Sequence, residues 1–243
     1  LVGDDNGEAQ VRFLSTTASS ATVLTTSRGA DPFELKISLL EDIDPEAVEA
    51  LTSSSDDTST DEPDFGIDVF LDAGIEQARE ENLEAYNAAL GNLTLDAEGI
   101  EDMVLVYNTL LEQANGGSVA LTEAQLAALG LEFDSAQAVV LMNELLSSQG
   151  VAALKDHSRL LTIARTVQSL MDRREGKPDP APISADDLTL LGLTGVTSRN
   201  AGYIVGVLTN PEQGSASLSL AAMQRVANEA AAEFGAIAIP TLS

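Results

Sequence analysis

The segment Ile183-Ser-Ala-Asp-Asp-Leu-Thr-Leu-Leu-Gly-Leu193 decides the fold, because its pattern occurs three times in the chain. The other two copies are Phe65-Gly-Ile-Asp-Val-Phe-Leu-Asp-Ala-Gly-Ile75 and Leu121-Thr-Glu-Ala-Gln-Leu-Ala-Ala-Leu-Gly-Leu131. Apolar residues coincide at four positions of the three copies, and so does the glycine, at spacings of 56 and 62 residues. Repetition at such a period is typical of tandem structural units that stack on one another.

Each copy predicts a helix of about two turns that begins at a cap and ends at the glycine. Thr122 with Gln125 fits a capping box, and Ser184 with Asp187 is a weaker version of it. The glycine stands where a left-handed C-terminal residue is wanted, and the apolar residue after it can fold back onto the helix, as in a Schellman cap. The predicted cap glycines are Gly74, Gly130 and Gly192.

Two more helices are expected after each copy, because apolar residues recur there at steps of three and four. The second helices are expected within residues 80–90, 134–146 and 197–208. The third helices are expected within residues 100–111, 160–171 and 218–230. Asp134 and Thr197 are predicted to be N-caps of two second helices.

The expected fold class is therefore mainly α, with three tandem three-helix repeat units. The units are residues 65–118, 119–176 and 177–243. One unit of this size buries only about 60% of its unfolded surface and is marginal alone, so we expect stacking. The first two units are expected to pack closely. The third follows a proline-rich spacer, Gly176–Pro182, that favours extended backbone, and is expected to sit at an angle.

The first 51 residues predict a small β-rich segment with a short helix. Residues 11–13, 21–26 and 33–39 are β-branched or alternating runs that predict two or three strands. These are too few for an independent β domain. A short helix is expected within residues 41–51, with Pro45 in its first turn. Residues 52–64 lack apolar periodicity and are expected to be an acidic linker.

The charge of the chain excludes two classes of partner. There are 39 acidic and 12 basic residues, so the formal net charge is −27. Such a surface repels nucleic acid and anionic membranes, and no apolar run approaches the roughly 18 residues of a membrane span. We expect neither partner. An acidic proteome and adaptation to saline or calcium-rich surroundings explain the charge equally well. Because the chain begins at Leu1 without a secretory signal, a matured product or an excerpt is expected.

The composition argues against an enzyme. There is no cysteine and only one histidine, and no nucleophile elbow or phosphate-binding glycine loop is present. His157 is expected to be a surface or capping residue. The pairs Tyr86-Asn87 and Tyr107-Asn108 are expected to be structural, with packed rings and hydroxyls in water, and a small binding patch there is the alternative.

The N-terminus offers the one candidate metal site. Asp4, Asn6 and Glu8 have the oxygen-rich, glycine-containing pattern of calcium loops, but the remaining ligand positions of an EF-hand are missing. A plain acidic turn is the favoured interpretation and a calcium site the alternative. No other cofactor is expected.

The pattern of Ile183–Asn200 resembles the small helical repeats of very large bacterial extracellular proteins, where they alternate with Ig-like β modules in adhesins and surface proteins. The resemblance extends over about residues 65–235. The second unit has Glu132-Phe-Asp134 in place of Gly-Val-Thr, and the first unit departs further. The resemblance implies a structural or adhesive role at the cell surface, with protein partners through self-association or neighbouring modules. An intracellular helical-repeat scaffold that binds a protein partner in a groove between units is the alternative.

Overall fold

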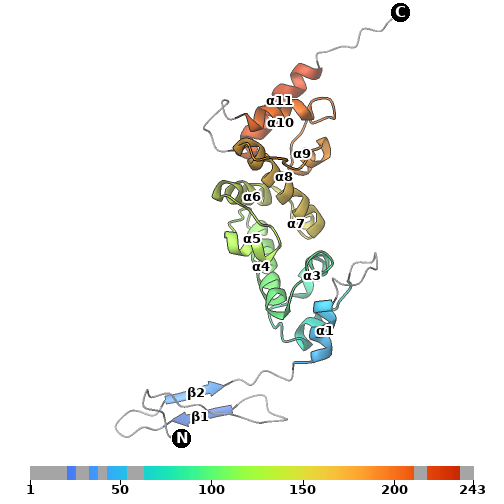
Figure 1. Cartoon of the computed structure of the whole chain (residues 1–243). Coiled ribbons are helices and arrows are strands. Elements are labelled where there is room, and N and C mark those ends of the chain that lie inside the picture. The colour runs from blue at the N-terminus through green and yellow to red at the C-terminus, as the bar shows by residue number, and fades with distance from the viewer. Residues whose placement is uncertain (1–20, 26–32, 38–42, 54–62, 211–217, 236–243) are drawn as a thin grey trace, which may run out of the picture.

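The computed structural model describes residues 21–25, 33–37, 43–53, 63–210 and 218–235. Within these residues the chain is mainly helical, as predicted, with eleven α-helices. The helices follow one another along an elongated body, from α1 at one end to α10 and α11 at the other (Figure 1). Among the described residues, no helix combines the length and apolar character that a membrane crossing requires.

Two strands lie near the N-terminus. β1 (Ala21–Thr25) pairs with β2 (Phe33–Ile37) in antiparallel register, with Val23 opposite Leu35. Both strands fall in runs of alternating or β-branched residues. The other run of the expected β-rich segment, residues 11–13, lies outside the described residues, so the extent of this segment stays a prediction.

Helix α1 (Pro45–Ser53) begins near the predicted residue because Pro45 has no N–H to leave unpaired in the first turn. The Asp44 carboxylate accepts a hydrogen bond from the backbone N–H of Glu46 at 2.9 Å. The helix buries Ala47 and Leu51 and packs against α2 and α4.

Three short helices coincide with the three sequence copies. They are α2 (Ile67–Asp72), α5 (Glu123–Ala128) and α9 (Ala185–Leu190). The glycine after each helix has a positive φ, of 83° at Gly74, 66° at Gly130 and 90° at Gly192. The N–H of the following residue bonds the carbonyl five residues earlier in all three, which is the Schellman arrangement. These glycines therefore have the left-handed conformation that the sequence predicts.

The N-caps agree with the sequence at two of the four predicted positions and differ at the other two. Thr122 and Ser184 both form complete capping boxes. The prediction at Asp134 is wrong by one residue, because the Ser135 hydroxyl caps α6 (Ala136–Ser148). The backbone N–H of Asp134 instead donates to the side chain of Gln168 on α8 at 3.3 Å. Asp134 thus fastens a loop to a neighbouring helix.

The prediction at Thr197 is also wrong. Helix α10 (Ala201–Thr209) has Asn200 at its N-cap, without a side-chain cap bond. The Thr197 N–H donates to the Asn200 side-chain oxygen at 2.7 Å, and the Asn200 amide nitrogen donates to the Gly195 carbonyl at 2.8 Å. The Asn200 side chain therefore bonds both sides of the turn before α10.

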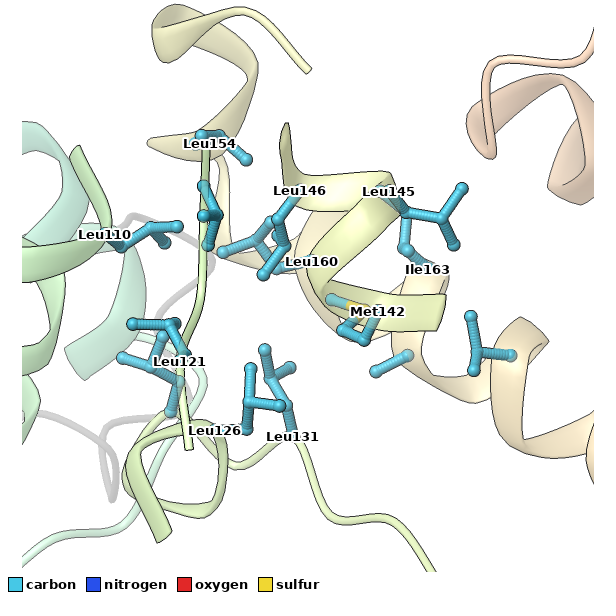
Figure 2. Close-up of a cluster of buried hydrophobic side chains, with 14 of the residues drawn as sticks. Leu110, Leu121, Leu126, Leu131, Met142, Leu145, Leu146, Leu154, Leu160 and Ile163 are labelled. Carbon is cyan, nitrogen blue, oxygen red and sulfur yellow. The ribbon is translucent and has the colours of Figure 1, made fainter. Parts of the chain in front are cut away.

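The longer helices supply one continuous apolar core. They are α3 (Leu83–Leu90, after a 3-10 turn η1 at Glu80–Asn82), α4 (Ala97–Asn115), α6, α8 (His157–Glu175), α10 and α11 (Leu220–Gly235). The short helix α7 (Val151–Leu154) was not expected from the sequence. Buried residues of one cluster run from Leu51 on α1 to Ala230 on α11. Figure 2 shows its middle, where Leu110 on α4 faces leucines of α5, α6, α7 and α8.

Helix α8 is the centre of the body. It packs against α3, α6, α7, α9 and α10. The spacer after it does not separate the following helices, because the chain reverses at Gly176, whose φ is 70°. The Ser169 hydroxyl and the Arg173 guanidinium then both donate to the Ala181 carbonyl, at 2.5 and 3.0 Å. The spacer is therefore bound along α8, and α9 and α10 lie directly on this helix.

Candidate functional site

A cluster of polar side chains lies buried between α3, α4 and the loops before them. The Tyr86 hydroxyl donates to the side-chain oxygen of Asn108, which also accepts from the Asn82 amide at 2.7 Å. The Asn108 amide nitrogen donates to the Gln77 carbonyl at 2.8 Å, and the Arg79 N–H donates to the Tyr86 oxygen at 3.3 Å. These bonds hold the loop backbone at Gln77 and Arg79 against α3 and α4.

The expectation that both tyrosine hydroxyls remain in water is wrong. Tyr86 and Tyr107 are each 0% exposed. Their rings form a chain of aromatic contacts from Phe70 through Tyr86 and Tyr107 to His157. Burial raises the pKa of both tyrosines, so both remain protonated donors at neutral pH. The alternative of a binding patch at these pairs has no open surface to support it.

His157 is buried, contrary to the expectation of a surface position. It is the first residue of α8, it is 0% exposed, and its Nδ1 lies 2.7 Å from the Tyr107 hydroxyl. Burial lowers the pKa of His157 to about 4, against the opposing effect of the Asp156 carboxylate. Its Nε2 has no hydrogen-bond partner within the described part of the chain. A neutral imidazole therefore links α4 to α8 at the junction of the first two predicted units.

Two asparagines clamp the starts of the first two sequence copies. Asn87 on α3 bonds the N–H and the carbonyl of Phe65, at 3.1 and 3.0 Å. Asn143 on α6 bonds the same two groups of Leu121, both at 2.8 Å. Each asparagine follows its partner by 22 residues, and Val205 occupies this place in the third copy. Sequence reasoning missed these clamps, although the equal spacing was visible.

A second set of amide side chains holds the loop after each cap glycine. In each predicted unit, a side chain on the longest helix bonds the backbone of that loop. In the third unit, the Gln224 amide both accepts from the Thr194 N–H at 3.0 Å and donates to the Thr194 carbonyl at 3.2 Å. The pairs are Asn108 with Gln77, Gln168 with Asp134, and Gln224 with Thr194. The same amide chemistry thus recurs three times along the body.

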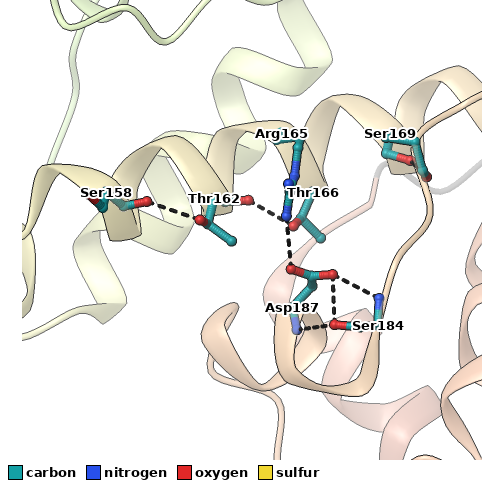
Figure 3. Close-up of polar contacts among 8 residues, drawn as sticks. Ser158, Thr162, Arg165, Thr166, Ser169, Ser184 and Asp187 are labelled. Carbon is teal, nitrogen blue, oxygen red and sulfur yellow. Dashed lines mark hydrogen bonds and ion pairs between the residues drawn. The ribbon is translucent and has the colours of Figure 1, made fainter. Parts of the chain in front are cut away.

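An ion pair joins α8 to α9. The Arg165 guanidinium lies 3.2 Å from the Asp187 carboxylate, whose other oxygen accepts from the N–H and hydroxyl of Ser184 (Figure 3). Burial by itself would raise the pKa of Asp187, but the hydrogen bonds from Ser184 and the charge of Arg165 lower it. The Asp187 carboxylate is therefore ionised and fully engaged with Arg165 and Ser184.

An open groove of about 340 Å³ lies beside α8, between the loop at Gly130 and the spacer. Its lining includes Leu161, Ala164, Arg165 and Gln168. Several of its polar groups already have partners, since Arg165 pairs with Asp187 and Gln168 bonds Asp134 and Asp172. No convergent set of free donors marks this groove as a small-molecule site.

The candidate calcium ligands Asp4, Asn6 and Glu8 lie outside the described residues. Within the described ranges, no group of three or more acidic or histidine side chains could hold a metal ion. Comparisons with protein-family models, curated proteins and solved structures found no match. Any functional interpretation therefore depends on the geometry of this chain.

Proposed function

We propose that residues 65–235 form a tandem array of three three-helix units, and that the chain is a non-enzymatic structural or adhesive module of a secreted or surface-attached bacterial protein. The units are those expected from the sequence. Each contains a short glycine-capped helix, a second helix and a long third helix: α2, α3 and α4, then α5, α6 and α8 with the extra α7, then α9, α10 and α11.

The observation that carries this proposal is that two kinds of helix contact recur between successive units. The third helix of one unit packs on the first helix of the next, as α4 on α5 and α8 on α9. The second helix of one unit packs on the third helix of the next, as α3 on α8 and α6 on α11. A chain built by repeating one junction has the form of a solenoid-like spacer.

The chemistry of the side chains supports the same proposal. The one histidine and its tyrosine partner are enclosed, and a catalytic pair must reach its substrate. The polar groups beside α8 are engaged with one another. The net charge of −27 keeps such an array soluble among other molecules. The resemblance of Ile183–Asn200 to repeats of bacterial surface proteins adds the expected extracellular location.

The groove beside α8 favours the alternative, an intracellular scaffold that binds a protein partner between units. It lies at the junction of the second and third units, and its apolar floor includes Leu161 and Ala164. Antibodies raised against this chain discriminate between the two. We expect labelling of intact source cells. Labelling only after permeabilisation would support the scaffold, and hydrolase turnover that is lost in His157→Ala would overturn both proposals.

A further inference from the structure

Helix α10, the second helix of the third unit, has an apolar face that its own unit covers only in part. Helix α10 is the one described helix of eight or more residues without a charged side chain. Tyr203 is 43% exposed, and its ring contacts Phe234 of α11 at a centroid distance of 5.6 Å. Val207 is partly exposed one turn further along the helix. Helix α10 lies near the end of the body, beside α11 (Figure 1).

The positions in the first two units that correspond to Tyr203 and Val207 can be found by aligning the clamp residues. The register that aligns Asn87, Asn143 and Val205 also aligns Tyr86, Met142 and Ile204, each 0% exposed. Burial therefore agrees with this register in all three units.

In the same register, the positions of Tyr203 and Val207 are fully buried in both preceding units. Ala85 and Leu141 are the equivalents of Tyr203, and Ala89 and Leu145 those of Val207, and all four are 0% exposed. The third helix of the following unit packs on these second helices, α8 on α3 and α11 on α6. Among the described elements, α10 packs against α8 and α11 of its own array, with no following third helix.

We propose that this face of α10, defined by Tyr203 and Val207, is the docking surface for the third helix of a further unit of the same kind. The proposal rests on the tandem array proposed above and names its partner. The two existing contacts, α8 on α3 and α11 on α6, indicate which helix would bind here. It is an amphipathic helix like α8 or α11, packed on α10 as α8 is packed on α3.

The surface chemistry fits such an occupant. The uncharged face lets an acidic unit approach an acidic array with little like-charge repulsion. Gly202 and Gly206 flank the face, and a Cβ built at either glycine meets no atom within 4 Å, so a helix backbone has room to approach. A second copy of the chain would have to present the third helix of its first unit, α4. That helix is already packed against α1, as is α2, so the first unit of a second copy does not present a free partner for this face.

The test uses the full chain, followed by a second copy of residues 177–243, with hydrogen exchange as the readout. We expect the amides of the first α10, distinguished from the appended copy by isotope labelling of one segment, to exchange at least about tenfold more slowly in the extended chain than in the original. Tyr203→Asp in the extended chain should remove this protection. The matched control is Val140→Asp on α6, because Val140 is 63% exposed even though a following unit is present. It should leave α10 exchange unchanged.

Unchanged α10 exchange in the extended chain would overturn the docking surface. A dimer of the original chain that Tyr203→Asp converts to a monomer would overturn it too, in favour of a second copy. Faster α10 exchange after truncation at Gly235 would assign the face to residues 236–243. Failure of the array itself is distinguishable, because α3 and α6 of the original chain would then exchange as fast as α10.

Discussion

The cap glycines differ in their surroundings, and this difference yields a quantitative prediction. Gly130 has a φ of 66°, and a Cβ added there would lie 2.6 Å from Cδ2 of Leu93. Gly192 has a φ of 90°, and the nearest atom to its added Cβ is 4.0 Å away. Gly176, with a φ of 70°, has no atom within 4 Å of that position. Alanine therefore strains the backbone at all three glycines but clashes only at Gly130.

The expected free-energy losses follow from these two effects. A left-handed residue with a Cβ costs about 1–2 kcal/mol, which applies to all three substitutions. At Gly130 the added Cβ also meets the end of the Leu93 side chain, which is only partly buried and can rotate, so the further cost there is about 1 kcal/mol, at the low end of overpacking. We therefore expect unfolding free energies about 2–3 kcal/mol lower for Gly130→Ala and about 1–2 kcal/mol lower for Gly192→Ala and Gly176→Ala.

Urea denaturation followed by circular dichroism measures these differences. Gly130→Ala should cost less in a Leu93→Ala background than in the wild-type chain, because Leu93→Ala removes the atom that clashes, and a double-mutant cycle measures this difference. Gly202→Ala is the control, since this glycine is inside α10 with open space around it, and alanine should stabilise the helix by up to about 1 kcal/mol. Equal losses at Gly130 and Gly192 would refute the role of Leu93. No loss at any of the three would refute left-handed caps.

Three further predictions follow from burial, hydrogen bonding and charge. Because the pKa of His157 is about 4 in the folded state and about 6.5 when unfolded, the unfolded chain binds the proton first, and wild type should lose about 2 kcal/mol relative to His157→Gln between pH 7 and pH 5. Urea titrations in which this difference does not change with pH would contradict the buried neutral imidazole. Asn143→Ala leaves the N–H and carbonyl of Leu121 unpaired and should cost about 1–3 kcal/mol, which calorimetry can measure. NaCl at about 0.5 M should raise the melting temperature of this −27 chain, and an unchanged value would show that repulsion does not limit stability.

The short helices and their glycines were predictable because their signals are local. A cap, two turns of apolar spacing and a glycine lie within eleven residues, and each acts on its own backbone. The N-caps after them were less predictable. Asp134 and Ser135 are both good caps, and the choice between them depends on Gln168, which is distant in sequence. At Thr197 the helix begins three residues later than predicted, after a turn that the Asn200 side chain bonds on both sides.

Burial of the polar cluster could not be predicted from the sequence. Tyrosine and histidine are intermediate in burial, so neither residue type decides whether a hydroxyl or an imidazole reaches water. What decides it here is that α4 meets α8 at Tyr107 and His157, 50 residues apart. The asparagine clamps were predictable only in part. Their spacing of 22 residues is visible in the sequence, but only the structure shows that each asparagine bonds the first residue of its sequence copy.

The buried polar groups explain how the leucine-rich helices of the proposed array keep a single register. Apolar burial is non-directional, so helices lined with leucine and alanine can slide at little cost. A hydrogen bond is directional, and an unpaired buried partner costs free energy, so Asn87 and Asn143 each allow one position of the strand-like segment before the short helix. In the third predicted unit, Val205 stands in place of the clamp, and the Arg165–Asp187 ion pair joins its first helix to α8. The contact between α8 and α9 should therefore weaken as salt is added, because Arg165 is largely exposed, whereas the asparagine clamps carry no charge to screen.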